Sequence, residues 1–209
     1  MPKVNKREAK REVKIVSEET QAMSITTPHF NVKFAPRRFL VYSRFNDRDW
    51  IHIREYNTIG GKSYPSKKGV CFTPARLSSL REKIEVIDKM LTQQEVNASY
   101  GIEVEEGFLY RAHLGANIYA TVHNKFGGVD LRRHWRPEGP LSFCPTKNGI
   151  YLPASQWVAL KGKLDQLLAA HTELLDVPEC INSHVNETEM LECRECFPFG
   201  SLKIGIDML

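Results

Sequence analysis

The chain has 209 residues, of which 42% are hydrophobic and 26% are charged, so it can form one large or two small packed domains. No apolar run approaches the roughly 20 residues that a membrane-spanning helix needs, and the charged N-terminus lacks the apolar region of a secretory signal. Five irregularly spaced cysteines are typical of a protein from a reducing compartment. We therefore expect no membrane partner.

The net charge of +4 is unevenly distributed along the chain. Residues 1–14 hold six Lys or Arg against two Glu, and residues 176–209 hold two Lys or Arg against seven Asp or Glu. A basic arm, a mildly basic body and an acidic tail are common in nucleic-acid-binding proteins, although solvated tails of other proteins have similar compositions.

Residues 1–26 lack apolar periodicity, which predicts a disordered basic arm. Its cations could form a nuclear-import or phosphate-binding patch, or they could only keep the chain soluble. They are Lys3, Lys6, Arg7, Lys10, Arg11 and Lys14.

Residues 27–92 have the pattern of four strands and a helix. Alternating apolar residues predict strands over 30–34, 37–45 and 50–56, the last two joined by a turn. In the third strand the isoleucines share one face, and the other face is polar, basic and aromatic. A loop with Gly60-Gly61 and Pro65 is expected to lead to a short strand over 69–72.

A helix is expected to follow at once. Thr73 is a good N-cap and Pro74 suits the first helical position. Leucines and isoleucines then recur at steps of three and four, which gives one apolar stripe. A polar, acidic linker over 93–107 is expected after it.

Residues 108–175 repeat this pattern, with strands expected at 108–111, 118–122, 129–135 and 149–152 and a helix from 154 to 175. Similar residues recur 78 positions apart in the first three strands and 80 apart from the loop onward, so a length change in one loop explains both offsets. The matching residues include Ile51 and Val129, Arg54 and Arg132, Pro65 and Pro145, Lys67 and Lys147, Gly69 and Gly149, and Leu77 and Trp157. One module is therefore present twice.

Residues 176–209 form an acidic tail without clear periodicity. Thiolate and imidazole are the usual zinc ligands, and Cys193 and Cys196 have the spacing of a half-site. Their candidate partners Cys180 and His184 do not have a standard partner spacing, so isolated surface thiols are the alternative. Zinc is the only cofactor that the sequence suggests.

No catalytic motif is present, so we do not expect an enzyme. Instead, basic and aromatic residues alternate on the strands and in their loops. Single-stranded nucleic acids are bound in this way, by cations that follow the phosphates and rings that stack on bases. The candidate binding residues are Arg38, Arg44, Phe45, Arg48, Arg54, Tyr56, Lys67, Lys68, Lys125, Arg132, Trp135 and Lys147, whereas Phe39, Phe72 and Trp157 are expected in the core.

The segments Ile51-His-Ile-Arg-Glu-Tyr56, Pro65-Ser-Lys-Lys-Gly69 and Thr73-Pro74 resemble the C-terminal domain of the transcriptional coactivator positive cofactor four. The second copy matches through Asp130-Leu131-Arg132, Trp135 and Lys147-Asn-Gly149. The resemblance implies an α+β fold in which a four-stranded antiparallel sheet precedes a helix. It also implies that two such units pair and bind single-stranded or melted DNA.

By position, the family's DNA-contacting residues fall on Phe45, Arg48, Arg54, Lys67 and Lys68, and in the second copy on Arg132, Trp135 and Lys147. Each copy departs from the family. Asn57 replaces a tryptophan in the first, and His123 and Asn148 replace a phenylalanine and a basic residue in the second.

The sequence thus predicts a nuclear, single-stranded DNA-binding protein that works with the transcription machinery as a coactivator, or in replication or repair. An RNA-binding protein with the same surface and a protein-interaction adaptor are the alternatives. Because both copies lie in one chain, we expect them to pair with each other in a monomeric pseudo-dimer.

Overall fold

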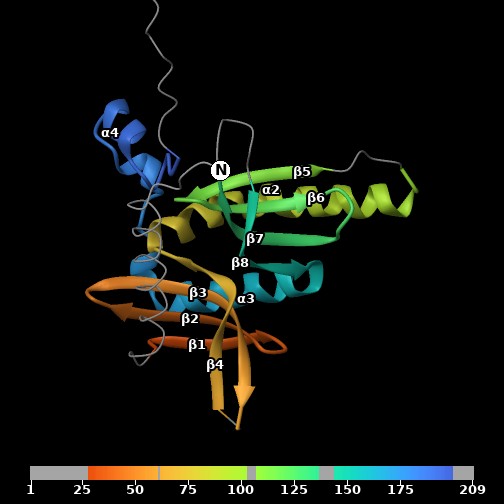
Figure 1. Ribbon diagram of the computed structural model, residues 1–209, viewed down its shortest axis with the longest axis horizontal. Helices are drawn as coiled ribbons and strands as arrows, with labels where there is room; N and C mark the ends of the chain where they lie inside the picture. The colour runs from red at the N-terminus through yellow and green to blue at the C-terminus, as the bar shows by residue number, and fades with distance from the viewer. Residues whose placement is uncertain (1–27, 61, 103–106, 137–143, 200–209) are drawn as a thin grey trace, which may run out of the picture.

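The computed structural model describes residues 28–60, 62–102, 107–136 and 144–199, and these form two ββββα modules (Figure 1). Each module has one antiparallel sheet in which the strands follow chain order. The first comprises β1 (Phe30–Ala35), β2 (Arg38–Phe45), β3 (Arg48–Ile59), β4 (Lys62–Phe72) and α2 (Pro74–Ser99). The second comprises β5 (Phe108–Gly115), β6 (Ile118–His123), β7 (Gly128–Trp135), β8 (Cys144–Pro153) and α3 (Ala154–Ala170). The expected α+β fold with two modules is confirmed.

The predicted turn between the second and third strands is a two-residue hairpin. Asn46 and Asp47 have φ angles of 51° and 56°, the left-handed values that suit a tight turn between twisted strands. Phe45 pairs directly with Arg48 across it. Asn and Asp tolerate this conformation better than other residues with a Cβ, which explains why the chain reverses here.

The segment between β3 and β4 is not the loop that the sequence suggested. The two strands continue to Ile59 and resume at Lys62, so Tyr56 pairs with Pro65 and Asn57 with Tyr64. This β3–β4 arm, residues 56–65, projects from the sheet at the lower edge of Figure 1. Pro65 is tolerated because β4 is an edge strand, where a missing backbone N–H costs no ladder bond.

Helix α2 begins as expected and ends later than expected. The Thr73 hydroxyl accepts a hydrogen bond from the Arg76 backbone N–H at 3.4 Å, and Pro74 occupies the first turn. The helix then continues to Ser99, through the first half of the segment predicted as a linker. Polar pairs one turn apart support this end, such as Gln93 with Asn97 at 2.9 Å.

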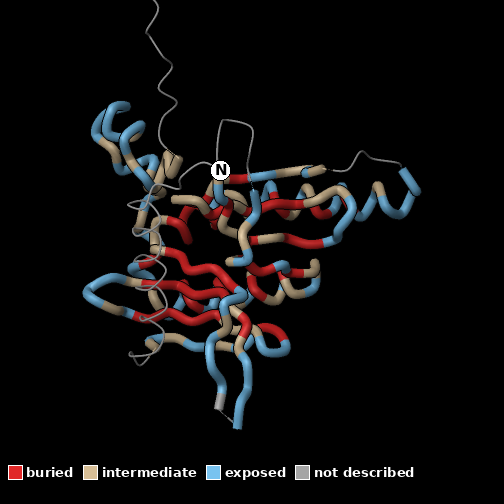
Figure 2. The backbone as a smooth tube through the Cα atoms, in the orientation of Figure 1, coloured by how far each residue is buried: buried red, intermediate tan, exposed pale blue. Residues whose placement is uncertain are grey.

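The hydrophobic core is shared by the two modules. Helix α2 packs mainly against β5 and β6 of the second sheet, and α3 packs against β1 and β2 of the first as well as against its own sheet. One continuous cluster of buried side chains therefore includes Ile51 and Phe72 of the first module and Leu131 and Leu152 of the second. The buried stretches in Figure 2 accordingly concentrate where the two modules meet.

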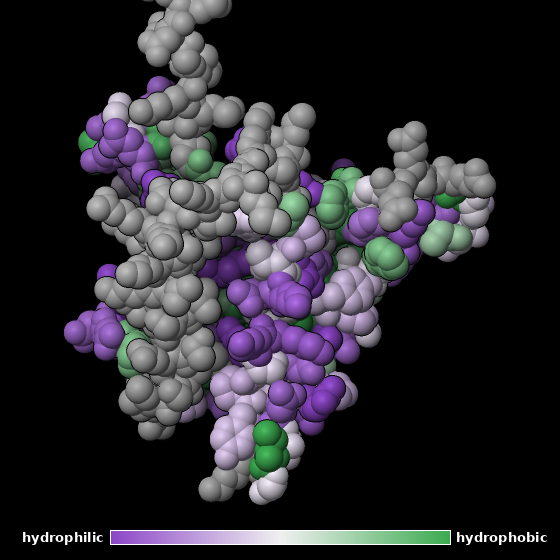
Figure 3. Space-filling model, in the orientation of Figure 1, coloured by the Kyte–Doolittle hydropathy of each residue, from purple (hydrophilic) through white to green (hydrophobic). Residues whose placement is uncertain are grey.

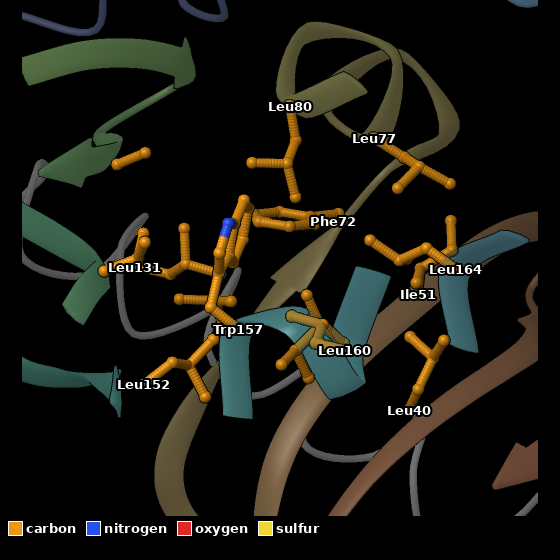
Figure 4. Close-up of a cluster of buried hydrophobic side chains, with 14 of the residues drawn as sticks. Leu40, Ile51, Phe72, Leu77, Leu80, Leu131, Leu152, Trp157, Leu160 and Leu164 are labelled. Atoms are coloured by element: carbon orange, nitrogen blue, oxygen red, sulfur yellow. The ribbon is translucent and has the colours of Figure 1, made fainter. Parts of the chain in front are cut away.

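Trp157 of α3 lies at the centre of this cluster. Its side chain is 0% exposed, and in Figure 4 its ring lies near Phe72 of the first module and between it and Leu131 of the second. Its indole N–H donates to the Asp88 carboxylate of α2 at 2.7 Å, and Lys161 of α3 forms an ion pair with the same carboxylate. The prediction that Phe72 and Trp157 belong to the core is confirmed.

The chain after α3 forms short helical turns: η1 (Thr172–Leu174), η2 (Cys180–Ser183) and α4 (Glu187–Glu192). Leu174 is the last buried residue before position 200, so residues 176–199 have no apolar core of their own. The basic arm predicted over residues 1–26 and the last residues of the tail lie outside the described parts of the chain. Within the described parts, no helix is long and apolar enough to cross a membrane.

Candidate nucleic-acid interface and metal cluster

The first sheet has an outer face, turned away from the shared core, that combines rings with polar groups. Because side chains alternate along a strand, this outer face is made by Phe39, Val41, Ser43 and Phe45 of β2, by Trp50, His52, Arg54 and Tyr56 of β3, and by Cys71 of β4. Trp50, Cys71 and Phe45 pack together as a second, small hydrophobic cluster. Phe39 was expected in the core but lies here, with its ring 4.9 Å from that of Tyr56.

The middle of the outer face is more buried than its polar sequence suggested. His52 is 0% exposed and Trp50 is 7% exposed. Burial, with a smaller contribution from the Arg54 charge, lowers the pKa of His52 to about 3, so its imidazole is neutral. Among the described residues, His52 Nδ1, Trp50 Nε1 and Ser43 Oγ have no hydrogen-bond partner. Such groups are rare in folded proteins.

A basic turn lies beside the outer face, where β4 passes β3. The Arg54 guanidinium donates to the Ser66 carbonyl at 2.8 Å, and the Ser66 hydroxyl accepts from the Lys68 backbone N–H at 3.1 Å. Gly69 follows with a φ of 157°, and a Cβ there would lie 2.6 Å from the Ile53 carbonyl oxygen. These contacts fix the turn that presents the exposed Lys67 and Lys68 side chains.

The second module repeats this turn at equivalent positions. Arg132 donates to the Thr146 carbonyl at 2.6 Å, and the Thr146 hydroxyl accepts from the Asn148 backbone N–H at 3.2 Å. A Cβ on Gly149 would lie 2.9 Å from the Leu131 carbonyl oxygen. The same local architecture therefore presents Lys147 and the neutral Asn148.

The strand arginines differ in what neutralises them. Arg132 forms a bidentate ion pair with Asp130, at 2.7 and 3.1 Å. The equivalent of Asp130 in the first sheet, 78 positions earlier, is the neutral His52. An anionic ligand near Arg132 would therefore compete with Asp130, whereas one near Lys68 would compete with Glu55, which lies 3.9 Å from the Lys68 ammonium.

The remaining basic candidates have different surroundings. Arg44 and Asp49 form a bidentate ion pair at 2.8 and 3.0 Å; hydrogen bonding to Asp49 raises the pKa of Arg44 and lowers that of the carboxyl. Arg48 is exposed at the hairpin turn, and Lys125 is exposed between β6 and β7. Arg38 instead lies at the contact between the modules, where it donates to the Tyr151 carbonyl at 2.7 Å.

Each module presents one exposed ring at the far end of its third and fourth strands. In the second module it is Trp135 of β7, which is 43% exposed and pairs with Cys144. In the first, Asn57 occupies the tryptophan position, and its cross-strand partner Tyr64 is 48% exposed. The exposed ring therefore lies on the fourth strand in the first module and on the third strand in the second. Sequence reasoning missed Tyr64 because it assigned this segment to a loop.

Rings also gather at the β6–β7 end of the second sheet. The Arg111 guanidinium lies 3.9 Å from the centre of the Phe108 ring. The His123 ring lies 5.6 Å from Phe108 and 4.9 Å from Phe126. Phe108 and Phe126 are more than half exposed, so they offer stacking surface at this end of the sheet.

Four side chains of the tail that are of types able to ligate a metal lie together. One ligand atom from each of Cys180, His184, Cys193 and Cys196 lies within 4.8 Å of the other three. The Cys180 sulfur is 3.7 Å from the Cys193 sulfur and 3.7 Å from His184 Nε2, and that nitrogen is 3.3 Å from the Cys196 sulfur. All three cysteines are free thiols. We call these four residues the tail cluster.

The view in Figure 3 shows mostly hydrophilic side chains around the junction of the modules and along the β3–β4 arm, with an apolar spot near the tip of the arm. Ile59, near that tip, is 68% exposed. The arm therefore offers polar, aromatic and apolar contacts on a narrow projection.

Comparison with known proteins finds a match to a protein family. A family model described as Transcriptional Coactivator p15 (PC4) matches residues 35–83, a segment that contains β2, β3, β4 and the first turns of α2. No curated protein matches the chain. The match supports a PC4-like fold for these residues of the first module.

Proposed function

We propose that this protein binds single-stranded or melted DNA and acts as a transcription coactivator. The observation that carries the proposal is the basic turn of the first module, in which Arg54 holds the segment that presents Lys67 and Lys68. Cations at this turn can follow phosphates, and the rings of the adjacent outer face and arm can stack on bases. The match of residues 35–83 to the PC4 family supports the same reading.

We further propose that the modules form an intramolecular pseudo-dimer with unequal binding surfaces. The shared core and the exchange of helix contacts support the pairing. Asn148 in place of a second lysine leaves the second turn with one lysine where the first has two. The chain is then a monomer of 24.0 kDa whose binding is dominated by the first module.

The cellular setting follows from the proposed activity. A coactivator of this kind works in the nucleus with the transcription machinery, and the six basic residues of 1–14 are suited to nuclear import or to phosphate contacts. We propose no catalytic role, in line with the PC4 family.

A competition titration tests the proposal. The full chain is bound to a labelled single-stranded DNA, and unlabelled single-stranded DNA, duplex DNA and RNA of the same length and salt concentration compete for it. We expect single-stranded DNA to compete best. Equal or better competition by RNA would assign the surface to RNA, since stacking and phosphate contacts do not by themselves select deoxyribose. Duplex preference, or no binding, would overturn the proposal.

A further inference from the structure

We propose that the tail cluster, Cys180, His184, Cys193 and Cys196, is a structural zinc site that fastens the tail across both modules. A tetrahedral zinc ion with ordinary bond lengths places two sulfurs about 3.8 Å apart and a sulfur and a nitrogen about 3.5 Å apart. The observed separations of 3.7 Å between sulfurs and 3.3 and 3.7 Å between sulfur and nitrogen fit this geometry. Three thiolates and one imidazole form a closed ligand set with no position for substrate, which is typical of structural zinc.

The segment needs such a site because it has no other interior. Residues 176–199 contain no buried residue, and the longest helix among them has six residues. A chain of this length without an apolar core is not expected to hold one conformation without a crosslink or a metal. The distances between the sulfurs are also too long for disulfide bonds.

Glu195 connects the site to both modules. It lies between the ligands Cys193 and Cys196, and its carboxylate accepts two hydrogen bonds from the buried Arg76 guanidinium of α2, one of them at 2.8 Å. Its backbone carbonyl accepts from the Ala116 N–H in the β5–β6 turn at 2.6 Å. A metal ion that fixes positions 193 and 196 therefore also fixes Glu195 against the first module's helix and the second module's sheet.

A further contact holds the start of the segment. Lys83 of α2 forms an ion pair with Glu179 at 3.3 Å, immediately before Cys180. The tail is thus tied to α2 before the first metal ligand, at Glu179, and between the last two, at Glu195. Zinc would hold together the ligands that lie along this segment. Loss of zinc should therefore raise the mobility of the whole segment rather than of one end.

Metal analysis tests the site. The full chain is purified under reducing conditions without chelator, and its zinc content is measured by elemental emission. We expect about one zinc per chain, lost in Cys193→Ser/Cys196→Ser and kept in Cys144→Ser, which removes an exposed cysteine outside the cluster. Substitution with Co²⁺ should give the thiolate charge-transfer bands of a tetrahedral sulfur-rich site, absent in the double variant.

Hydrogen exchange tests the fastening. Removal of the metal by a strong chelator should raise exchange by at least about tenfold over residues 176–199 and at Ala116, while the strands of both sheets stay protected. Glu195→Gln should keep the zinc and loosen only the contact with Arg76. A chain that neither contains nor takes up zinc, one that keeps zinc in the double variant, or one that holds iron instead would overturn the site. Unchanged exchange at Ala116 after metal removal would overturn the fastening.

Discussion

The two basic turns show how the same local backbone architecture can present different side-chain charges. Arg54 and Arg132 each donate to the carbonyl of the turn that follows, so both are held in the same way. Arg132 is also paired with Asp130 of its own strand, whereas in the first module the carboxylate of Glu55 lies beside Lys68. Backbone architecture is therefore retained in both modules, whereas the field that a phosphate would meet differs.

The exposed lysines of the first turn are the place to test phosphate contacts. Lys67→Ala/Lys68→Ala should weaken single-stranded DNA binding and flatten its salt dependence by about 0.7 per lost contact, or about 1.4 for two. Both side chains are exposed, so stability should not change. Lys147→Ala should cost less, and Lys89→Ala, on the exposed side of α2, should have no effect. An unaltered salt dependence of binding in the double variant would show that the binding surface lies elsewhere.

The buried His52 imidazole makes stability depend on pH. Its pKa is about 3 in the folded protein, with Arg54 and the Cys71 thiol as neighbours, and about 6.5 in an unfolded chain. Below about pH 6.5 the unfolded chain binds a proton that the folded chain excludes, so the free energy of unfolding should fall by up to about 1.4 kcal/mol per pH unit, toward pH 3. Above pH 6.5 both states are neutral and the effect disappears.

Urea unfolding of the wild type and of His52→Gln, at about pH 7.5 and about pH 5, measures this effect. The variant should lose less stability on acidification than the wild type, because it lacks the proton-excluding imidazole. His29→Gln, at an exposed histidine, is the control. Equal losses in the wild type and His52→Gln would show that the imidazole is protonated in the folded state.

At the scale of elements, sequence reasoning succeeded where periodicity was strong and failed where breaking residues misled it. The alternation around Ile51 and Ile53 predicted β3, and the Thr73-Pro74 pair predicted the start of α2. Gly60-Gly61 and Pro65 suggested a loop, yet an edge strand accommodates proline, and Gly60, with a φ of 57°, lies at the turn. The sequence also does not reveal the tail cluster's geometry, because tertiary folding brings Cys180-x3-His184 beside the Cys193-x2-Cys196 pair.

The β3–β4 arm adds an exposed ring, Tyr64, to the proposed binding surface. Tyr64→Ala should weaken single-stranded DNA binding by about 1–3 kcal/mol, the usual contribution of one stacked base. The ring is half exposed and outside the core, so the free energy of unfolding should change by no more than about 0.5 kcal/mol. Fluorescence anisotropy and urea unfolding measure the two quantities. Tyr100→Ala, at an exposed tyrosine beyond the end of α2, is the matched control.

A loss of affinity in Tyr64→Ala without loss of stability would assign the ring to the ligand. Equal affinities of Tyr64→Ala and the wild type would show that Tyr64 does not replace the tryptophan whose position Asn57 occupies. In that case Trp135→Ala in the second module should weaken DNA binding more than Tyr64→Ala does. This order is the reverse of the one that the charges of the two modules predict.

At the scale of the whole molecule, the exchange of helix contacts makes neither module complete alone. Helix α2 covers the second sheet and α3 reaches the first, so Leu77, Leu80 and Trp157 are buried by residues from both halves of the chain. The short contact between Trp157 and Asp88 joins the two helices directly. Folding of the two modules should therefore be coupled, and one substitution in α3 should be felt in the first sheet.

Trp157→Ala tests this coupling, because the chain holds two further tryptophans, one in each sheet. Loss of the fully buried indole should cost about 3–5 kcal/mol. Trp50 reports on the first sheet in Trp157→Ala/Trp135→Phe, and Trp135 reports on the second in Trp157→Ala/Trp50→Phe. The single variants Trp135→Phe and Trp50→Phe are the references. Compared with them, the unfolding midpoints reported by Trp50 and by Trp135 should move to lower urea concentration by a similar amount, and both signals should follow one transition. If Trp50 keeps its midpoint while Trp135 shifts, the modules unfold independently and the shared core contributes nothing to their coupling.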